Sequence, residues 1–192
     1  MVGNPSPRSP AGLHDVELAS LSAAGDRKAF GELVRRHGSA VRALLRRMGA
    51  DPATADDLAQ DAFLAAFEAI ADFRGEGAFA GWVKRIAARL YIKRWKKAKS
   101  LDLGLEPEDT PLPSHESESN TRVDLDEAMK VLSPAERMSV SLCFGGGLSH
   151  SEAAEALNTP LGTVKSHVKR GLDKLRRRLE AVPERPGRQV HG

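Results

Sequence analysis

The sequence predicts an all-α protein made of two small helical domains joined by a flexible linker, the C-terminal one being a helix-turn-helix. Apolar residues recur at spacings of three, four and seven along almost the whole chain, and no alternating strand pattern of useful length occurs. A stretch rich in Pro, Ser and Glu, without periodicity, divides the chain at residues 100–123. Beyond it, two short helical patterns are joined by a few residues, and the second is strongly basic.

The first elements are bounded by helix-capping residues. Residues 1–14 are Pro and Ser rich and are expected to be a disordered lead, followed by a domain over residues 15–99. A short helix over residues 16–24 is expected to end at Gly25. Asp26 then caps a long helix whose apolar stripe stops at Gly49.

The rest of this domain is expected to hold two more helices. Asp51 followed by Pro52 is typical of an N-cap and first helical position, and opens a helix that reaches about residue 70. A Gly-rich loop over residues 73–77 leads into a basic helix over residues 79–97.

The second domain is expected over residues 124–181, with a disordered tail over residues 182–192. Capping boxes at Ser133–Glu136 and Ser149–Glu152 each predict a helix start, the first helix ending at the glycines of residues 145–147. The second helix is short and rich in alanine, and the last one begins near Pro160.

Composition restricts the function classes. The 192 residues are 41% hydrophobic, and no apolar run approaches the roughly 18 residues that a membrane span needs, so we expect no membrane insertion. The start of the chain lacks the apolar stretch of a secretory signal. The single cysteine, Cys143, is expected to be a buried, unreactive thiol rather than a redox sensor, and suits the reducing cytoplasm.

Charge is arranged in blocks along the chain. Residues 84–99 hold eight basic residues and no acidic one, and residues 165–178 hold seven basic residues against one aspartate. Between them, residues 101–128 hold nine acidic residues and one arginine. Two basic faces on an acidic tether favour two contacts with one polyanion, although each block alone is equally typical of a solvated helix face.

The last helix has the features of a DNA-reading helix. Its apolar stripe leaves Lys165, Ser166, Lys169 and Arg170 on the outer side, where they can reach base edges or phosphates in a major groove. A helical bundle with a solvated basic face is the alternative. The segments 132–137 (LSPAER), 147–157 (GLSHSEAAEAL) and 160–167 (PLGTVKSH) resemble the promoter-binding domain of extracytoplasmic-function (ECF) sigma factors of bacterial RNA polymerase.

That resemblance assigns the −35 promoter element to the last helix. By position it implicates Thr163, Lys165, Ser166, Lys169 and Arg170. Two positions depart from the family pattern: His167 stands where an arginine is common, and Ala154 where a larger aliphatic residue is common.

The N-terminal domain carries the matching resemblance. Residues 56–67 (DDLAQDAFLAAF) resemble the sigma-factor helix that docks on the clamp helices of the largest polymerase subunit. This implicates Asp57, Gln60, Asp61 and Phe67; without the resemblance, an acidic solvated face would be the simpler interpretation.

Residues 73–87 (FRGEGAFAGWVKRIA) resemble the family segment that reads and opens the −10 element. Aromatic rings interleaved with cations suit unstacked bases and their phosphates. The implicated residues are Phe73, Arg74, Trp82, Arg85, Arg89 and Lys93. Phe73 is expected to be exposed, whereas Trp82 is equally compatible with the core. Arg89 stands where the family often has asparagine.

The resemblance implies a sigma factor that binds core RNA polymerase, including the flap of the second-largest subunit, and promoter DNA, and that is held by an anti-sigma factor. No P-loop, dinucleotide fingerprint, zinc-spaced histidines or nucleophile elbow occurs, so no catalytic residue, cofactor or metal is predicted. The alternatives are a helix-turn-helix regulator that acts without polymerase and a helical adaptor that binds only proteins.

Overall fold

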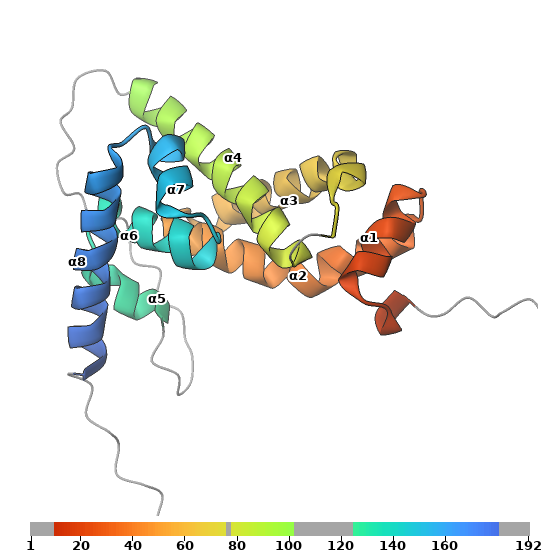
Figure 1. Cartoon of the computed structure of the whole chain (residues 1–192), viewed down its shortest axis with the longest axis horizontal. Coiled ribbons are helices and arrows are strands. Elements are labelled where there is room, and N and C mark those ends of the chain that lie inside the picture. The colour runs from red at the N-terminus through yellow and green to blue at the C-terminus, as the bar shows by residue number, and fades with distance from the viewer. Residues whose placement is uncertain (1–9, 76–77, 102–124, 181–192) are drawn as a thin grey trace, which may run out of the picture.

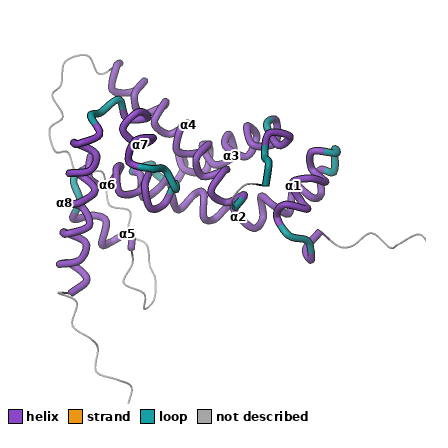
Figure 2. Tube along the Cα trace, in the orientation of Figure 1, coloured by secondary structure: helices purple, strands orange, loops and turns teal. Residues whose placement is uncertain are grey.

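The computed structural model describes residues 10–75, 78–101 and 125–180, and within these ranges the chain is helical with no strand (Figures 1 and 2). The elements in chain order are η1 (Pro10–Gly12), α1 (Asp15–Ala23), α2 (Arg27–Met48), α3 (Pro52–Glu68), η2 (Ile70–Asp72), α4 (Phe79–Leu101), α5 (Leu125–Ala128), η3 (Met129–Val131), α6 (Pro134–Val140), η4 (Ser141–Gly145), α7 (His150–Leu157) and α8 (Leu161–Glu180). The all-α prediction is confirmed.

Local capping explains where the N-terminal helices begin. The side chain of Asp26 accepts a hydrogen bond from the Lys28 amide at 2.8 Å, and Asp51 accepts one from the Thr54 amide at 3.0 Å. Each bond satisfies an amide that a helix start leaves without an intrahelical partner. Gly49, with φ of 114°, ends α2 in the left-handed conformation that favours glycine.

Helices α2, α3 and α4 pack around one apolar core. Leu33, Leu44 and Leu45 of α2 are fully buried in it, together with Phe79 and Val83 of α4. The hydroxyl of the buried Tyr91 donates to the carbonyl of Met48 at 3.1 Å, which joins the end of α2 to the middle of α4.

The chain just before α1 is ordered, contrary to the expected disordered lead over residues 1–14. Residues 10–12 form η1, and the guanidinium of Arg36 donates to three carbonyls there: Pro10 at 3.3 Å, Ala11 at 2.9 Å and Leu13 at 2.8 Å. These partners lie more than twenty residues from Arg36, so a local pattern could not reveal them. Residues 1–9 and the predicted linker and tail beyond residues 101 and 180 lie outside the described residues.

Two helices of the second half begin at the predicted capping residues. Ser133 with Glu136 and Ser149 with Glu152 form capping boxes, and Asn158 ends α7 with φ of 53°. One detail differs: the helix that was expected to continue to the glycines changes at Ser141 into η4, a π-helical turn.

The two halves share a core. Met138, Leu142 and Val164 of the second half belong to the same buried cluster as Leu33 and Leu44 of the first. Helix α2 contacts α6 and η4, and α4 contacts α7 (Figure 1). The approach is close, because a Cβ on Gly145 would lie 2.7 Å from Cδ1 of Leu44. Helices α1 and α8 lie at opposite ends of the molecule (Figure 1).

Candidate polymerase and promoter interfaces

The predicted docking residues lie on one face of α3. Asp57, Gln60 and Asp61 are exposed, and their offsets of three and four place them on adjacent turns of the same side. Phe67, two turns further, is half-buried. The structure thus brings the three polar residues together, and leaves Phe67 packed beside them against α2.

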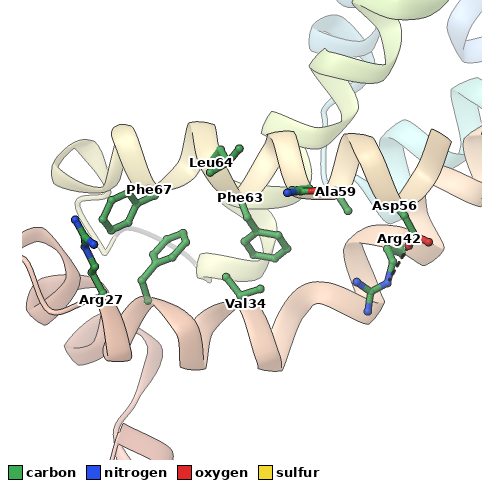
Figure 3. A pocket seen from close by; sticks show the side chains of 10 residues that line it. Arg27, Val34, Arg42, Asp56, Ala59, Phe63, Leu64 and Phe67 are labelled. Atoms are coloured by element: carbon green, nitrogen blue, oxygen red, sulfur yellow. Dashed lines mark ion pairs between the residues drawn. The ribbon is translucent and has the colours of Figure 1, made fainter. Parts of the chain in front are cut away.

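A groove of about 890 Å³ runs between α2 and α3 next to this face (Figure 3). Its wall is apolar in the middle and polar at the ends, and the lining residues are Arg27, Phe30, Val34, Arg42, Asp56, Ala59, Gln60, Phe63, Leu64 and Phe67. The ring of Phe30 stacks edge-on against Phe67 with centroids 4.9 Å apart. Arg42 pairs with Asp56 at 3.6 Å at one end.

This groove was not predicted, because its wall comes from both α2 and α3. Phe30 and Val34 belong to the apolar stripe of α2, but both side chains are only partly buried. Their exposure becomes visible only when α3 is in place. Leu64 is 57% exposed at the groove, so the surface combines apolar contact area with the exposed carboxylates of α3.

The aromatic residues before and at the start of α4 form a cluster. Phe73, Phe79 and Trp82, called the aromatic cluster below, have ring centroids between 5.4 and 5.7 Å apart. Phe79 is buried, whereas Phe73 and Trp82 are half-buried. Phe73 is therefore less exposed than expected, because it packs against both other rings, and Trp82 both contacts the core and reaches the surface.

The predicted −10 cations are exposed. Arg85, Arg89 and Lys93 follow each other at intervals of four on α4, which places them along one side of the helix, and Arg74 is exposed before it. Glu152 of α7 lies close to this row. Hydrogen bonds from the backbone and side chain of Ser149 lower the pKa of Glu152, and the charges of Arg85 and Arg89 lower it further.

The outer face of α8 presents the predicted −35 residues. Lys165, Ser166, Lys169 and Arg170 are exposed, and Thr163 is half-buried. The inner face holds Val164 and Val168 in the core. The hydroxyl of Ser166 donates to the Gly162 carbonyl at 2.9 Å, which keeps it on the helix surface.

Arg170 has a structural partner that the sequence did not reveal. Its Nε lies 3.7 Å from Oε1 of Glu136, and Nζ of Lys174 donates to Oε2 of the same carboxylate at 2.8 Å. Glu136 is buried, which raises its pKa, but the hydrogen bonds from Lys174 and the Ser133 amide and the two positive charges outweigh burial, so the pKa lies below its ordinary value. The ion pairs fasten α8 to the start of α6.

Two other titratable residues of this half are shielded. Burial, together with the charge of Arg170, lowers the pKa of His167, which favours the uncharged form of the ring. Cys143 is half-buried, and burial raises the pKa of its thiol, which favours the unreactive form.

Other kinds of site find no support in the described part of the chain. Its His, Cys, Asp and Glu residues form no cluster suited to a metal ion. None of the helices in residues 10–75, 78–101 and 125–180 is long and apolar enough to span a membrane.

Known proteins with similar sequences decide the family. The chain is 36% identical over 177 residues to the RNA polymerase sigma factor NccH of Alcaligenes xylosoxydans xylosoxydans, which covers 87% of this chain and 95% of that protein. It is 31% identical to the ECF RNA polymerase sigma factor SigM of Mycobacterium tuberculosis, in an alignment that covers 86% of this chain and 84% of that protein. The chain belongs to the ECF sigma factors. Another member, SigW of Bacillus subtilis, is 31% identical over 175 residues.

Family models place both sigma regions on this sigma factor. Sigma-70 region 2 matches residues 33–101, and sigma-70 region 4 matches residues 128–177. Region 2 therefore includes most of α2 together with α3 and α4, and region 4 includes α6, α7 and most of α8. The helix-turn-helix of the second half is the one in region 4.

Solved structures agree with the fold. CnrH in complex with the cytosolic domain of CnrY has a TM-score of 0.52 at 28% identity, with 88% of this chain and 99% of that chain covered. The sigma factor RpoE in complex with the anti-sigma factor NepR from Bartonella quintana has a TM-score of 0.55 at 22% identity. The match covers 81% of this chain and 99% of that chain. The second likeness concerns the fold alone.

Proposed function

We propose that this sigma factor binds core RNA polymerase through α3, recognises the −35 and −10 promoter elements with α8 and α4, and helps to open the DNA. The observation that carries the proposal is the separation of charge between exposed helix faces. Carboxylates gather on α3, and cations gather on α4 and α8. An acidic face repels DNA and suits a protein partner, while basic faces attract phosphates.

The groove beside Asp57, Gln60 and Asp61 supports polymerase docking at α3. Protein interfaces combine an apolar centre with a polar rim, and the exposed Leu64 beside these carboxylates has that arrangement. The proposed partner is the pair of clamp helices of the largest polymerase subunit. Region 4 is proposed to contact the flap of the second-largest subunit.

At the −10 element, the aromatic cluster is proposed to receive bases of the opened strand. Half-buried rings such as Phe73 and Trp82 offer faces on which bases stack, worth about 1–3 kcal/mol per base. Arg74, before α4, and Arg85, Arg89 and Lys93, along one side of α4, are exposed and are proposed to hold the phosphates.

At the −35 element, the first two turns of α8 are proposed to enter the major groove. Lys165, Ser166 and Lys169 are exposed there, and among the described residues the ion pairs from α8 to α6 come from Arg170 and Lys174 instead. Thr163 and Arg170 flank them. Because its pKa is lowered, His167 is proposed to supply less of a phosphate contact than an arginine would, which shifts more of the binding onto Lys165 and Lys169.

The shared core of the two halves is proposed to hold the −10 and −35 faces on one body, so that binding of one region raises the effective concentration of the other at its own element. We further propose that the protein works in the cytoplasm by binding alone, and that an anti-sigma factor holds it. CnrH, a relative at 28% identity, was solved with the cytosolic domain of CnrY.

In vitro transcription with purified core polymerase tests the proposal. Promoters are first mapped by sequencing transcript starts after overexpression of the protein. We expect transcripts from those promoters only when core polymerase and the sigma factor are both present. Tight, specific promoter binding by the isolated protein would instead indicate a conventional helix-turn-helix regulator. Absence of both core binding and DNA binding would indicate a protein adaptor.

A further inference from the structure

We propose that α1 holds the aromatic cluster in position for the −10 strand. The positioning residues are Asp15 and Val16 of α1 and His37 of α2. This inference rests on the proposed −10 role of Phe73 and Trp82. Helix α1 precedes the residues matched by sigma-70 region 2, which begin at residue 33, and none of the residues predicted to contact DNA or polymerase lies on it.

The first turn of α1 is fixed to α2 by a paired carboxylate. Oδ1 of Asp15 accepts from Nη1 of Arg36 at 3.0 Å, and Oδ2 accepts from Nε2 of His37 at 2.7 Å. A carboxylate oxygen accepts, so Nε2 of the imidazole donates this hydrogen bond and the ring is held in one orientation. Both side chains of the Asp15–His37 pair are mostly shielded, at 27% and 17% exposed, which limits screening by water.

His37, which is held by Asp15, also contacts the aromatic cluster. Its ring lies 5.5 Å from that of Phe79, and Phe79 is in turn in contact with the rings of both Phe73 and Trp82. Phe79 is buried, so it cannot shift without moving its neighbours. The orientation of the imidazole therefore limits where the two half-buried rings can lie.

A second contact reaches the chain next to the cluster from α1 itself. Helix α1 packs against η2, the turn that ends just before Phe73. A Cβ on Gly75 would lie 3.4 Å from Cγ1 of Val16, so the backbone passes close to this side chain. Gly75 has φ of 74°, a conformation that favours glycine and permits the approach.

The cluster thus has two contacts that lead back to α1. Val16 supports the backbone after Phe73, and His37 supports Phe79. Val16 is 52% exposed, so it adds little to the core that Leu18 and Ala19 of the same helix already form. Fixing a binding surface in advance lowers the entropy lost when a ligand binds, which is the expected advantage for a strand that must be captured as it opens.

The test compares Val16→Ala and Asp15→Asn with the wild-type chain, each bound to core polymerase. The probe is a fluorescent single-stranded oligonucleotide with the non-template −10 segment of a promoter mapped from transcript starts. We expect both variants to bind it about fivefold more weakly, because the rings are no longer held for stacking. We expect unchanged affinity for core polymerase, and full transcription to be partly restored on a template already mismatched at −10.

Leu21→Ala is the matched control, since Leu21 is exposed on α1 but lies about 140° around the helix from Val16. It should bind the oligonucleotide like the wild type. Equal oligonucleotide binding by all variants would overturn the inference. So would a parallel loss of core affinity and melting temperature in Val16→Ala, which would make α1 a stability element only. If the wild-type complex itself fails to bind the oligonucleotide, the proposed −10 function fails, and the inference with it.

Discussion

Single residues on α3 offer the sharpest test of polymerase docking. Asp61→Lys reverses a charge on an exposed side chain, so we expect loss of core binding by at least about tenfold with an unchanged fold. Fluorescence titration against core polymerase and circular dichroism measure the two effects. Asp72→Lys makes the same charge change on η2, outside α3, and should bind core like the wild type. Equal losses in both variants would mean that only net charge matters.

On α8, Lys165 is a cleaner probe than Arg170. Arg170 is within ion-pair range of the buried Glu136, so Arg170→Ala changes packing as well as any DNA contact. We expect Lys165→Ala to lower transcription from −35-dependent promoters about tenfold, with little change at promoters that lack a −35 element. Lys130→Ala, which removes an exposed lysine elsewhere in this half, should leave both promoter classes unaffected. Equal loss at both classes would argue against −35 recognition.

The residues that the sequence predicted for these faces are mainly surface residues, for a physical reason. A helix stripe shows which side chains point outward, so Lys165 and Asp61 could be placed from spacing alone. Contacts with residues far away in the sequence could not be predicted in this way. The clearest example is Glu136, which pairs with Arg170 and Lys174 of α8 in addition to forming its capping box. Phe73 is less exposed than predicted, because Phe79 and Trp82 fold against it.

Between elements, the packing of α6 against α8 depends on one glycine. A Cβ on Gly171 would lie 2.8 Å from Cγ2 of Val140, so Gly171→Ala should destabilise the fold by about 1–3 kcal/mol. Gly162→Ala is the control, because a Cβ there meets nothing within 4 Å and the added alanine should stabilise α8 by about 0.5–1 kcal/mol. Chemical denaturation measures both values, and a shift of the same sign for the two would contradict the packing.

Glu32 holds Arg36, and Arg36 in turn binds the carbonyls of residues 10–13, so this attachment of the start of the chain to α2 should depend on pH. Hydrogen bonds from Arg35 and Arg36 lower the pKa of Glu32 from its ordinary value of 4.5 to about 2. A folded-state pKa below the unfolded one means that the contribution is complete above about pH 4.5 and is lost as the pH falls toward 2. In Glu32→Gln, the melting temperature should therefore fall less steeply than in the wild type when the pH is lowered from about 5 to about 3. A slope equal to that of the wild type would rule this group out.

Helix starts were predictable and the contacts between helices were not. Asp26, Asp51, Ser133 and Ser149 cap helices through amides two or three residues away, so their signal lies within a few letters of sequence. The π-helical turn at Ser141 has no such local signal. The carbonyls of residues 10–13 are bound by Arg36, and that contact exists only once the chain has folded back on α2.

At the scale of the whole molecule, the shared core predicts that the halves unfold together. Leu44→Ala removes a buried side chain of α2 that faces Gly145, and we expect a cost of about 2–5 kcal/mol. Hydrogen exchange should then speed up in α6 and η4 as well as in α2. Leu179→Ala, at an exposed position of α8, is the control. Acceleration confined to α2 would show that the halves are independent.

The layout of two domains was predictable, but their contact was not. The composition change at residues 100–123 marks a boundary whatever the domains do in space. The contact of η4 and α6 with α2 has no sequence signal, because periodicity tells which face of a helix is buried and not what buries it.

The approach of Leu44 to Gly145 also bears on how such a chain can be recombined. A hybrid that joined the first half of this protein to the second half of a relative would bring an unrelated side chain against Leu44, where not even a methyl group fits without rearrangement. Its promoter contacts could be intact while its two halves no longer matched. A hybrid therefore has to keep a glycine opposite Leu44, and an exchange of specificity is better made by replacing the outer face of α8 than by exchanging the whole region.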